Sequence, residues 1–381
     1  MQRTIYNDDH DLFRDTVRQF VGRTLRPRQE QMLDTKTVAR EIWKEAGTLG
    51  ILGLSIPEEY GGTGAADFRF NAIAAEEIAA FSLGVASCLS IHADVCPPYI
   101  VDVGTEDQKH RWLPGIATGE LICAIAMTEP SGGSDLAAVK TNAVRDGNTW
   151  VLNGSKTFIT NGYQADLVIV AARTHPGAGA KGITLFVVEE PMPGFTRGRK
   201  LDKVGQDEAD TAELFFDNVR VPDQNRLGEA GQGFIAMMQL LTQERLIASV
   251  SNVAHTAQIL TETISYAKER RAFGQTIGAF QYNKFTLAEL VTKIDVTQGY
   301  LDQCLLAHTH GELSAVDAAK AKWWSAEIQN EVLDSCVQLH GGYGYMNEYR
   351  VARAWKDARI TKIWAGTNEI MKEIIGRDLG L

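Results

Sequence analysis

The sequence predicts an α+β protein with a helical domain over residues 1–120, a β domain over residues 121–230 and a second helical domain over residues 231–381. Two observations support this fold class. Apolar residues recur at helical spacing in the first and last thirds, whereas the middle third contains short β-rich runs separated by Gly, Asn, Asp and Pro. A length of 381 residues also suits more than one hydrophobic core.

The first third is expected to be helical because apolar side chains return every three or four positions, as at Phe13, Val17 and Phe20. Prolines interrupt this pattern at Pro57 and at Pro97-Pro98.

The β-rich runs of the middle third begin at Trp150, Leu167, Ile183 and Glu213. Helical spacing returns after Gly233 and continues almost to the last residue, and later glycines mark the turns between long helices.

Composition excludes several classes of function. The net charge of -10 opposes binding to nucleic acid, which requires clustered Lys and Arg. The five cysteines show no CxxC pair and no spacing typical of a metal site, so we expect no metal and a reducing compartment. No signal-peptide pattern and no long apolar stretch occur, so the sequence predicts a cytoplasmic protein without membrane insertion.

The segment Gly231–Ala236 matches the GxGxxA form of a dinucleotide-binding fingerprint, but its context does not fit. That motif needs a preceding strand within a βαβ unit and an acidic residue about 20 positions later. Here Pro222 and polar residues precede it, and Ser251 stands at the later position. We therefore interpret this segment as a loop that leads into a helix.

Two glycine-rich segments are candidates for ligand binding. Residues 126–135 join an apolar run to a Gly-Gly turn with free backbone N–H groups and hydroxyls, which suits an anionic ligand. Residues 338–345 place three glycines within four positions, which is costly inside a helix. Each segment is either a plain turn or a place where the backbone approaches a ligand closely.

Together these two segments resemble the acyl-CoA dehydrogenase family, and the resemblance extends over the whole chain. Within that family the sequence looks closest to the long-chain and isovaleryl branches. Four further motifs carry the resemblance: Pro57-Glu-Glu-Tyr-Gly-Gly, Phe158-Ile-Thr-Asn-Gly, Arg270-Arg-Ala-Phe-Gly and Ala365-Gly-Thr-Asn-Glu-Ile.

The resemblance implies an N-terminal helical domain, a middle β-barrel and a C-terminal four-helix bundle, assembled as a homotetramer or a dimer. It also implies bound FAD. The residues that it assigns to FAD are Ile125, Ala126, Met127, Thr128, Gly133, Ser134, Phe158, Ile159, Thr160, Arg270, Phe273, Gln281, Gln338, Leu339, His340, Gly341, Gly342, Thr367, Asn368 and Glu369. Some of them would reach a neighbouring subunit's cofactor.

Some of these residues also fit simpler roles. Thr367 is a natural N-cap, Arg270 a helix-surface charge and Gln281 a solvated residue. Phe158 stands where the commonest family pattern has Trp, which preserves an aromatic face for the flavin.

The base is the point at which this chain departs from most of the family. Most members carry a Glu immediately before the Gly-Thr of the last motif, where this chain has Ala365. Glu244 has apolar neighbours one helical turn away on both sides, and it resembles the base of the long-chain and isovaleryl branches. The alternative is a Glu that pairs with a nearby Arg or lies at a helix edge.

These residues imply dehydrogenation of a fatty or branched acyl-CoA to the trans-2-enoyl-CoA, with electrons passed to an electron-transferring flavoprotein. Glu244 would remove the α proton, and the backbone N–H of Ala365 would bind the thioester oxygen. The candidate substrate contacts are Ser134, Leu241, Arg245, Tyr266 and Gly366. The alternatives are an acyl-CoA oxidase or flavin monooxygenase on the same fold, and a non-catalytic acyl-CoA-binding subunit.

Overall fold

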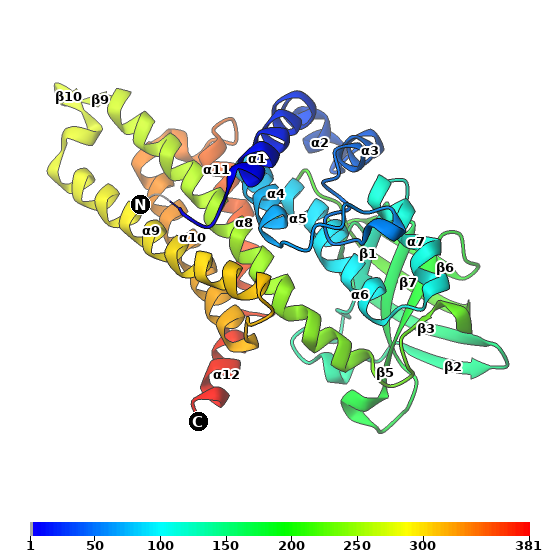
Figure 1. The fold of residues 1–381 in the computed structure, drawn as a ribbon. Coiled ribbons are helices and arrows are strands. Elements are labelled where there is room, and N and C mark those ends of the chain that lie inside the picture. Colours follow the sequence, from blue (N-terminus) through cyan, green and yellow to red (C-terminus); the bar gives the residue numbers. More distant parts are fainter. Residues whose placement is uncertain (1–2) are drawn as a thin grey trace.

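The structure is a computed structural model that describes residues 3–381, and its elements run helical, β and helical along the chain (Figure 1). The first helices are α1 (Asp8–Phe20), α2 (Gln29–Thr35), α3 (Arg40–Thr48), α4 (Arg69–Phe81), α5 (Leu83–Ser90), α6 (Cys96–Val103) and α7 (Glu106–Thr118). The predicted fold class is thus confirmed for this part of the chain.

The N-terminal helices enclose their own apolar core. Phe20 from α1 packs with Ile42 and Trp43 from α3 and with Ile78 from α4, and all four are buried. A π-helical turn, Ile91–Val95, joins α5 to α6 and directs α6 toward the rest of the molecule.

The β domain is one sheet. Its strands are β1 (Cys123–Ala126), β2 (Asn142–Asp146), β3 (Thr149–Thr160), β4 (Leu167–Arg173), β5 (Ile183–Glu189), β6 (Phe195–Lys200), β7 (Thr211–Pro222) and β8 (Arg226–Leu227). Their order is β6-β7-β3-β2-β4-β5-β8, and β1 pairs parallel to β4. The four β-rich runs found in the sequence correspond to β3, β4, β5 and β7.

The predicted middle β domain between two helical domains is confirmed, and its strands enclose one apolar core. The edge strands β6 and β8 do not pair with each other in the part of the chain that the structure describes. The two halves of the sheet instead fold over a shared core. Trp150 from β3 lies against Phe186 from β5, with ring centroids 5.4 Å apart, and Leu152, Val170 and Leu214 fill the same interior.

The C-terminal helices are α8 (Gly233–Glu269), α9 (Gln281–Thr309), α10 (Ala315–His340), α11 (Arg350–Ala358) and α12 (Asn368–Asp378), with a short hairpin of β9 (Arg271–Ala272) and β10 (Gln275–Thr276) after α8. Helices α8 to α11 share one core and form the helical bundle. No helix within residues 3–381 is long and apolar enough to cross a membrane.

Helix α8 is the element that connects the parts of the molecule. Its 37 residues correspond to about 55 Å. It begins at the β domain and ends at the β9–β10 hairpin at the far end of the bundle (Figure 1). Gly233 opens this helix directly, which agrees with the interpretation of Gly231–Ala236 as a loop that leads into a helix.

Candidate active site

Glu244 lies on α8 in an apolar setting and accepts a hydrogen bond from Tyr99 on α6, with an Oη to Oε1 distance of 2.9 Å. Burial raises the pKa of Glu244 to about 7, although the Tyr99 hydrogen bond and the charge of Arg245 act to lower it. A carboxyl with this pKa can accept a proton near neutral pH. Sequence reasoning missed Tyr99, because its contact with Glu244 joins two elements that are 145 positions apart.

Ala365 and Gly366 form a loop before α12 that has left-handed backbone torsions, with φ values of +50° and +87°. The φ of +87° at Gly366 is a conformation that residues with a Cβ rarely adopt, which explains the glycine at this position. No acceptor within residues 3–381 takes the N–H of Ala365. Ala365 is half-buried, so this N–H is open to water or to a ligand, which makes it a candidate for binding a substrate oxygen.

The same loop lies against α8 close to Glu244. Arg245, the next residue after Glu244, is buried, and its Nη2 is 4.0 Å from the position of a Cβ on Gly366. The loop therefore lies against the residue that directly follows the proposed base.

The turn after β1 is held by a buried ion pair. Lys156 donates from Nζ to Glu129 Oε1 (2.9 Å) and to the backbone oxygen of Met127 (3.0 Å). Burial lowers the pKa of Lys156 to about 8, although Glu129 acts to raise it. The backbone N–H of Thr157 also donates to the oxygen of Thr128 (3.0 Å), so the two segments assigned to the flavin ring lie side by side.

Phe158 occupies a β-bulge in β3, with φ +60°, and its side chain is 69% exposed. An aromatic side chain pushed out of a sheet in this way leaves a flat apolar face without a partner. The hydroxyls of Thr128, Ser134 and Thr160 likewise have no hydrogen bond to any of residues 3–381. These groups fit a planar ligand with hydrogen-bonding edges.

Two neighbours of these groups cannot contact a ligand through their side chains. Ala126 and Ile159 are buried in the core of the β domain. The alternation of side chains along a strand explains this, because Ile159 points inward where Phe158 and Thr160 point outward. Any contact of Ala126 or Ile159 with FAD is therefore limited to the backbone.

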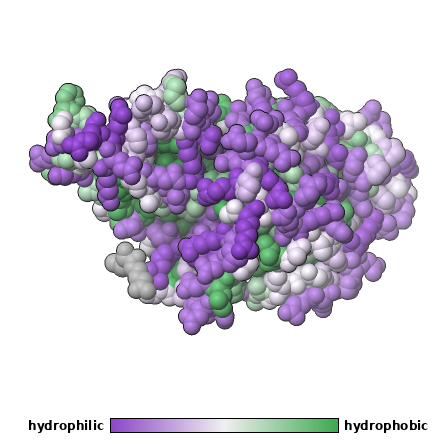
Figure 2. Space-filling model, turned by 90° about the horizontal axis from the view of Figure 1, so that it is seen from above, coloured by the Kyte–Doolittle hydropathy of each residue, from purple (hydrophilic) through white to green (hydrophobic). Residues whose placement is uncertain are grey.

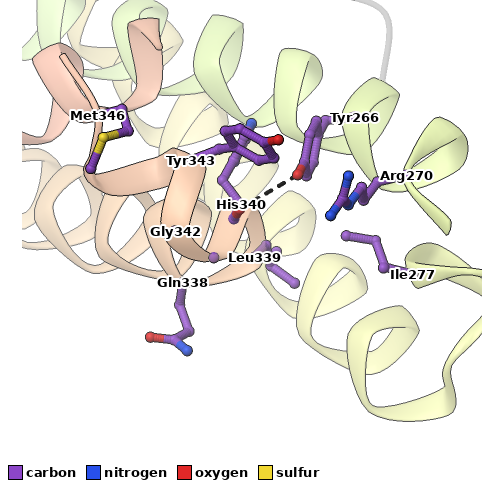
Figure 3. A pocket seen from close by; sticks show the side chains of 10 residues that line it. Tyr266, Arg270, Ile277, Gln338, Leu339, His340, Gly342, Tyr343 and Met346 are labelled. Atoms are coloured by element: carbon purple, nitrogen blue, oxygen red, sulfur yellow. Dashed lines mark hydrogen bonds between the residues drawn. The ribbon is translucent and has the colours of Figure 1, made fainter. Parts of the chain in front are cut away.

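A second group of predicted cofactor residues lines a cavity of about 420 Å³ at the far end of the bundle (Figure 3). Arg270 and the segment 338–342 face each other across it. Gly341 has φ +60°, and no atom stands within 4 Å of a Cβ built on Gly341 or Gly342, so the backbone is open to a ligand. Arg270 lies over the Tyr343 ring, 5.5 Å from its centroid.

Tyr266 belongs to this cavity and not to the surroundings of Glu244. Its ring stacks on His340 with centroids 4.2 Å apart, and its hydroxyl donates to the His340 backbone oxygen (Figure 3). It follows Glu244 by 22 residues on one helix, which is about 33 Å. This separation places Tyr266 away from Glu244, and its expected contact with the pantetheine or nucleotide part of CoA stays a prediction.

The last motif serves the fold as well as the site. Thr367 is the N-cap of α12 and accepts the N–H of Ile370 (3.3 Å), which is the simpler role considered for it. Asn368 is buried, and its amide donates to Glu327 Oε1 (3.0 Å), so that amide is not free for FAD. Glu369 is exposed, as are Phe273 and Gln281 at the other end of the bundle.

The remaining predicted residues lie close to the same features. Leu241 is buried one turn before Glu244, and Ile125 and Met127 are half-buried at the end of β1. Gly133 folds back on Thr128, since a Cβ on it would stand 3.3 Å from Thr128 Cγ2. Gln338 and Leu339 line the distant cavity beside His340.

The fold and these groups fit a flavin-dependent oxidoreductase with a carboxylate base. Comparison with known families is more specific. The chain matches the acyl-CoA dehydrogenase N-terminal domain over residues 7–120, the middle domain over 124–219 and the C-terminal domain over 231–380. The protein belongs to the acyl-CoA dehydrogenase family. It is an FAD-dependent oxidoreductase that dehydrogenates an acyl-CoA.

Two relatives cover nearly the whole chain. The mitochondrial long-chain specific acyl-CoA dehydrogenase of Sus scrofa is 47% identical over 379 residues, which is 99% of this chain and 88% of that protein. The mitochondrial isovaleryl-CoA dehydrogenase of Solanum tuberosum is 37% identical over 377 residues, 98% of this chain and 91% of that protein. The resemblance to these two branches is confirmed.

Solved structures of similar proteins agree with this family assignment. An acyl-CoA dehydrogenase from Geobacillus kaustophilus has a TM-score of 0.98 at 43% identity and covers 100% of both chains. A structure described as the electron transferring flavoprotein of Acidaminococcus fermentans has a TM-score of 0.95 at 35% identity, covering 99% of both chains. A glutaryl-CoA dehydrogenase from Mycobacterium smegmatis, in complex with FADH2, has a TM-score of 0.92 at 30% identity, covering 98% of this chain and 95% of that one.

Replacing Lys156 by Met should destabilise the β domain, because it leaves Glu129 buried without its partner. We expect a loss of roughly 3–5 kcal/mol in the free energy of unfolding, measured by urea denaturation. The control is Arg220→Met, which removes an exposed ion pair with Asp146 and should cost less than about 1 kcal/mol. Equal losses in the two variants would contradict a special role for the buried pair.

Replacing Tyr99 by Phe should raise the pKa of Glu244 further, because the hydrogen bond from Tyr99 favours the charged carboxylate. The acidic limb of the pH profile of kcat/KM should then move to higher pH by roughly one pH unit, given the usual strength of a hydrogen bond to a charged group. The measurement is the rate of dye reduction from pH 5 to pH 9. A profile that does not move, or moves to lower pH, would contradict this assignment.

Proposed function

We propose that Glu244 is the base of this acyl-CoA dehydrogenase and that its substrate is a fatty or branched acyl-CoA. The observation that carries the proposal is the carboxyl of Glu244, with a pKa raised to about 7, beside a loop where Ala365 has no carboxylate of its own. Removal of an α proton requires such a group near the working pH. Glu244 takes that proton while the acyl group of the substrate loses its β hydrogen.

FAD supplies the acceptor for the β hydrogen, which leaves as a hydride. The chain offers Phe158, Thr128 and Thr160 to hold and orient the flavin ring. Ser134, Leu241, Arg245 and Gly366 are the candidates for contact with the acyl-CoA near Glu244, and the N–H of Ala365 polarises its thioester oxygen.

The second cofactor region implies that a neighbouring subunit completes the site. The residues for the ring lie at the β domain, whereas Arg270 and the segment 338–342 lie at the opposite end of the bundle (Figure 1). One extended FAD does not reach both regions of a single chain, given the length of α8. We infer a dimer or a homotetramer in which the distant cavity, including Tyr266, receives the adenosine end of the partner's cofactor.

Exposed aromatic side chains support this assembly. Phe273 in the turn of the β9–β10 hairpin is 95% exposed, and Tyr282 and Phe285 on α9 are also exposed. Figure 2 shows hydrophobic side chains at the left end of an otherwise mostly hydrophilic face, where Figure 1 places this hairpin. An apolar tip of this kind is typical of a protein interface.

The proposed electron acceptor is an electron-transferring flavoprotein, and the proposed compartment is the cytoplasm. A reducing compartment suits the five cysteines, all of which are buried and unpaired. Slow reoxidation of the reduced flavin by air would separate this dehydrogenase from an oxidase or monooxygenase of the same fold.

Replacing Glu244 by Gln tests the base. The variant keeps the volume and a hydrogen bond to Tyr99 but cannot accept the proton, so flavin reduction by acyl-CoA should fall by about 10²–10⁴-fold. Bound FAD and acyl-CoA affinity should stay unchanged. The measurement is anaerobic bleaching of the flavin by a substrate that reduces the unmodified protein. If the variant bleaches equally fast, Glu244 is not the base.

The double variant Glu244→Gln with Ala365→Glu is the matched control. It places a carboxylate where most relatives carry one and should recover part of the lost rate. Recovery need not be complete, because a misplacement of about 1 Å can cost on the order of a hundredfold.

Replacing Phe273 by Asp tests the assembly. A charge at the exposed tip should weaken the subunit interface, so light scattering should show smaller species, and FAD should be lost on gel filtration. Leu12→Asp is the control, because Leu12 is an exposed apolar residue on α1, far along the chain from the hairpin. An unmodified protein that is monomeric and yet saturated with FAD would rule out the shared site.

A further inference from the structure

A buried lysine lies beneath the loop that contains Ala365. Lys322 on α10 is fully enclosed, and its ammonium donates to the backbone oxygen of Gly366 (2.6 Å) and to Asn368 Oδ1 (3.3 Å). No carboxylate within residues 3–381 forms a hydrogen bond with it. An ammonium buried without a carboxylate partner is costly, so the groups that it holds are informative.

A second cation lies against the same loop. Arg245 is buried beside Gly366, and its Nε has no hydrogen-bond partner in the described part of the chain. Burial and the nearby Arg245 lower the pKa of Lys322 to about 7. The charges of Glu369 and Glu327 act to raise that pKa. Two basic side chains are thus packed behind a loop whose opposite side is proposed to meet the thioester oxygen.

Other contacts fix both ends of the loop that contains Ala365 and Gly366, and Lys322 contacts its middle. Glu327 on α10 accepts from Lys362 Nζ (2.6 Å) before the loop and from the amide of Asn368 (3.0 Å) after it. Between these two points, the only hydrogen bond from α10 to the loop within the described residues 3–381 is that of Lys322 to Gly366. Lys322 therefore holds the part of the loop that carries the left-handed torsions.

Those torsions decide where the Ala365 N–H points. A φ of +50° is disfavoured for a residue with a Cβ, so Ala365 keeps it only if the surroundings enforce it. The hydrogen bond to the Gly366 oxygen fixes the peptide plane that follows these two residues. If that plane is released, Ala365 can relax and turn its unpaired N–H away.

We propose that Lys322 is a positioning residue that holds the backbone of Ala365 and Gly366 so that the Ala365 N–H stays directed at the thioester oxygen. The proposal rests on the function proposed above. Negative charge gathers on that oxygen as the α proton leaves, and a donor fixed in advance stabilises it most. Lys322 acts through the loop and touches neither substrate nor cofactor in this role.

The test is Lys322→Met in the FAD-loaded enzyme, with three measurements. The rate of flavin reduction by acyl-CoA should fall by about tenfold to a hundredfold. The carbonyl stretching frequency of a bound enoyl-CoA, measured by Raman difference spectroscopy, should move toward its value in water because the carbonyl is less polarised. The affinity for CoA, which has no thioester carbonyl, should be unchanged.

Lys320→Met is the matched control, because Lys320 lies on the same helix in an exposed pair with Asp317 and should leave all three measurements unchanged. Lys322→Gln keeps a neutral donor and should retain more of the rate and of the carbonyl shift than Lys322→Met. It also serves as the test if the Met variant does not fold.

Three results would overturn the proposal. A Lys322→Met variant with an unaltered rate and frequency would do so, as would a slower variant with an unaltered frequency. Failure of both variants to yield FAD-loaded protein would assign Lys322 to folding alone. Failure of the unmodified protein to bleach with any acyl-CoA would instead contradict the proposed function. Glu244→Gln should keep the carbonyl shift, because the base does not touch that oxygen.

Discussion

The site depends on the burial of the Glu244 carboxyl away from water. Glu244 has a pKa near 7 only because helices from two domains exclude water around it, and the Tyr99 hydrogen bond keeps it from becoming permanently neutral. Helix α6 must pack on α8 for this balance to exist. The N-terminal domain therefore contributes to the chemistry although it carries none of the residues assigned to the cofactor.

Local sequence patterns were sufficient for the order of domains and for the four long strands, since these depend on periodicity and on turn residues. The order of the strands could not be predicted, because it depends on pairing between segments distant in the sequence, which no local pattern encodes. Glu244 could be singled out from its apolar neighbours one turn away. Tyr99 and Lys322 could not be singled out, because the proposed role of each depends on a contact with a residue distant in the sequence.

Only part of the predicted cofactor site could likewise be predicted from the sequence. The segments 126–134 and 158–160 were assigned together by resemblance, and the structure supplies the reason, which is the Lys156–Glu129 pair and the hydrogen bond between Thr157 and Thr128. Side-chain direction was less accessible to sequence analysis. Ala126 and Ile159 point into the core, and the amide of Asn368 is occupied by Glu327, so a matching motif does not make every residue in it a contact.

The length of α8 has a consequence for genetics. Glu244 lies in the first third of this helix and Arg270 directly follows its last residue, and in the proposed assembly they serve two different active sites. A subunit without its base and a subunit without its cavity arginine would each be defective alone. Mixed in one cell, they would form hybrid oligomers in which one site receives both intact parts. Two recessive alleles of this single gene would then complement each other, which is unexpected for an enzyme with a self-contained site.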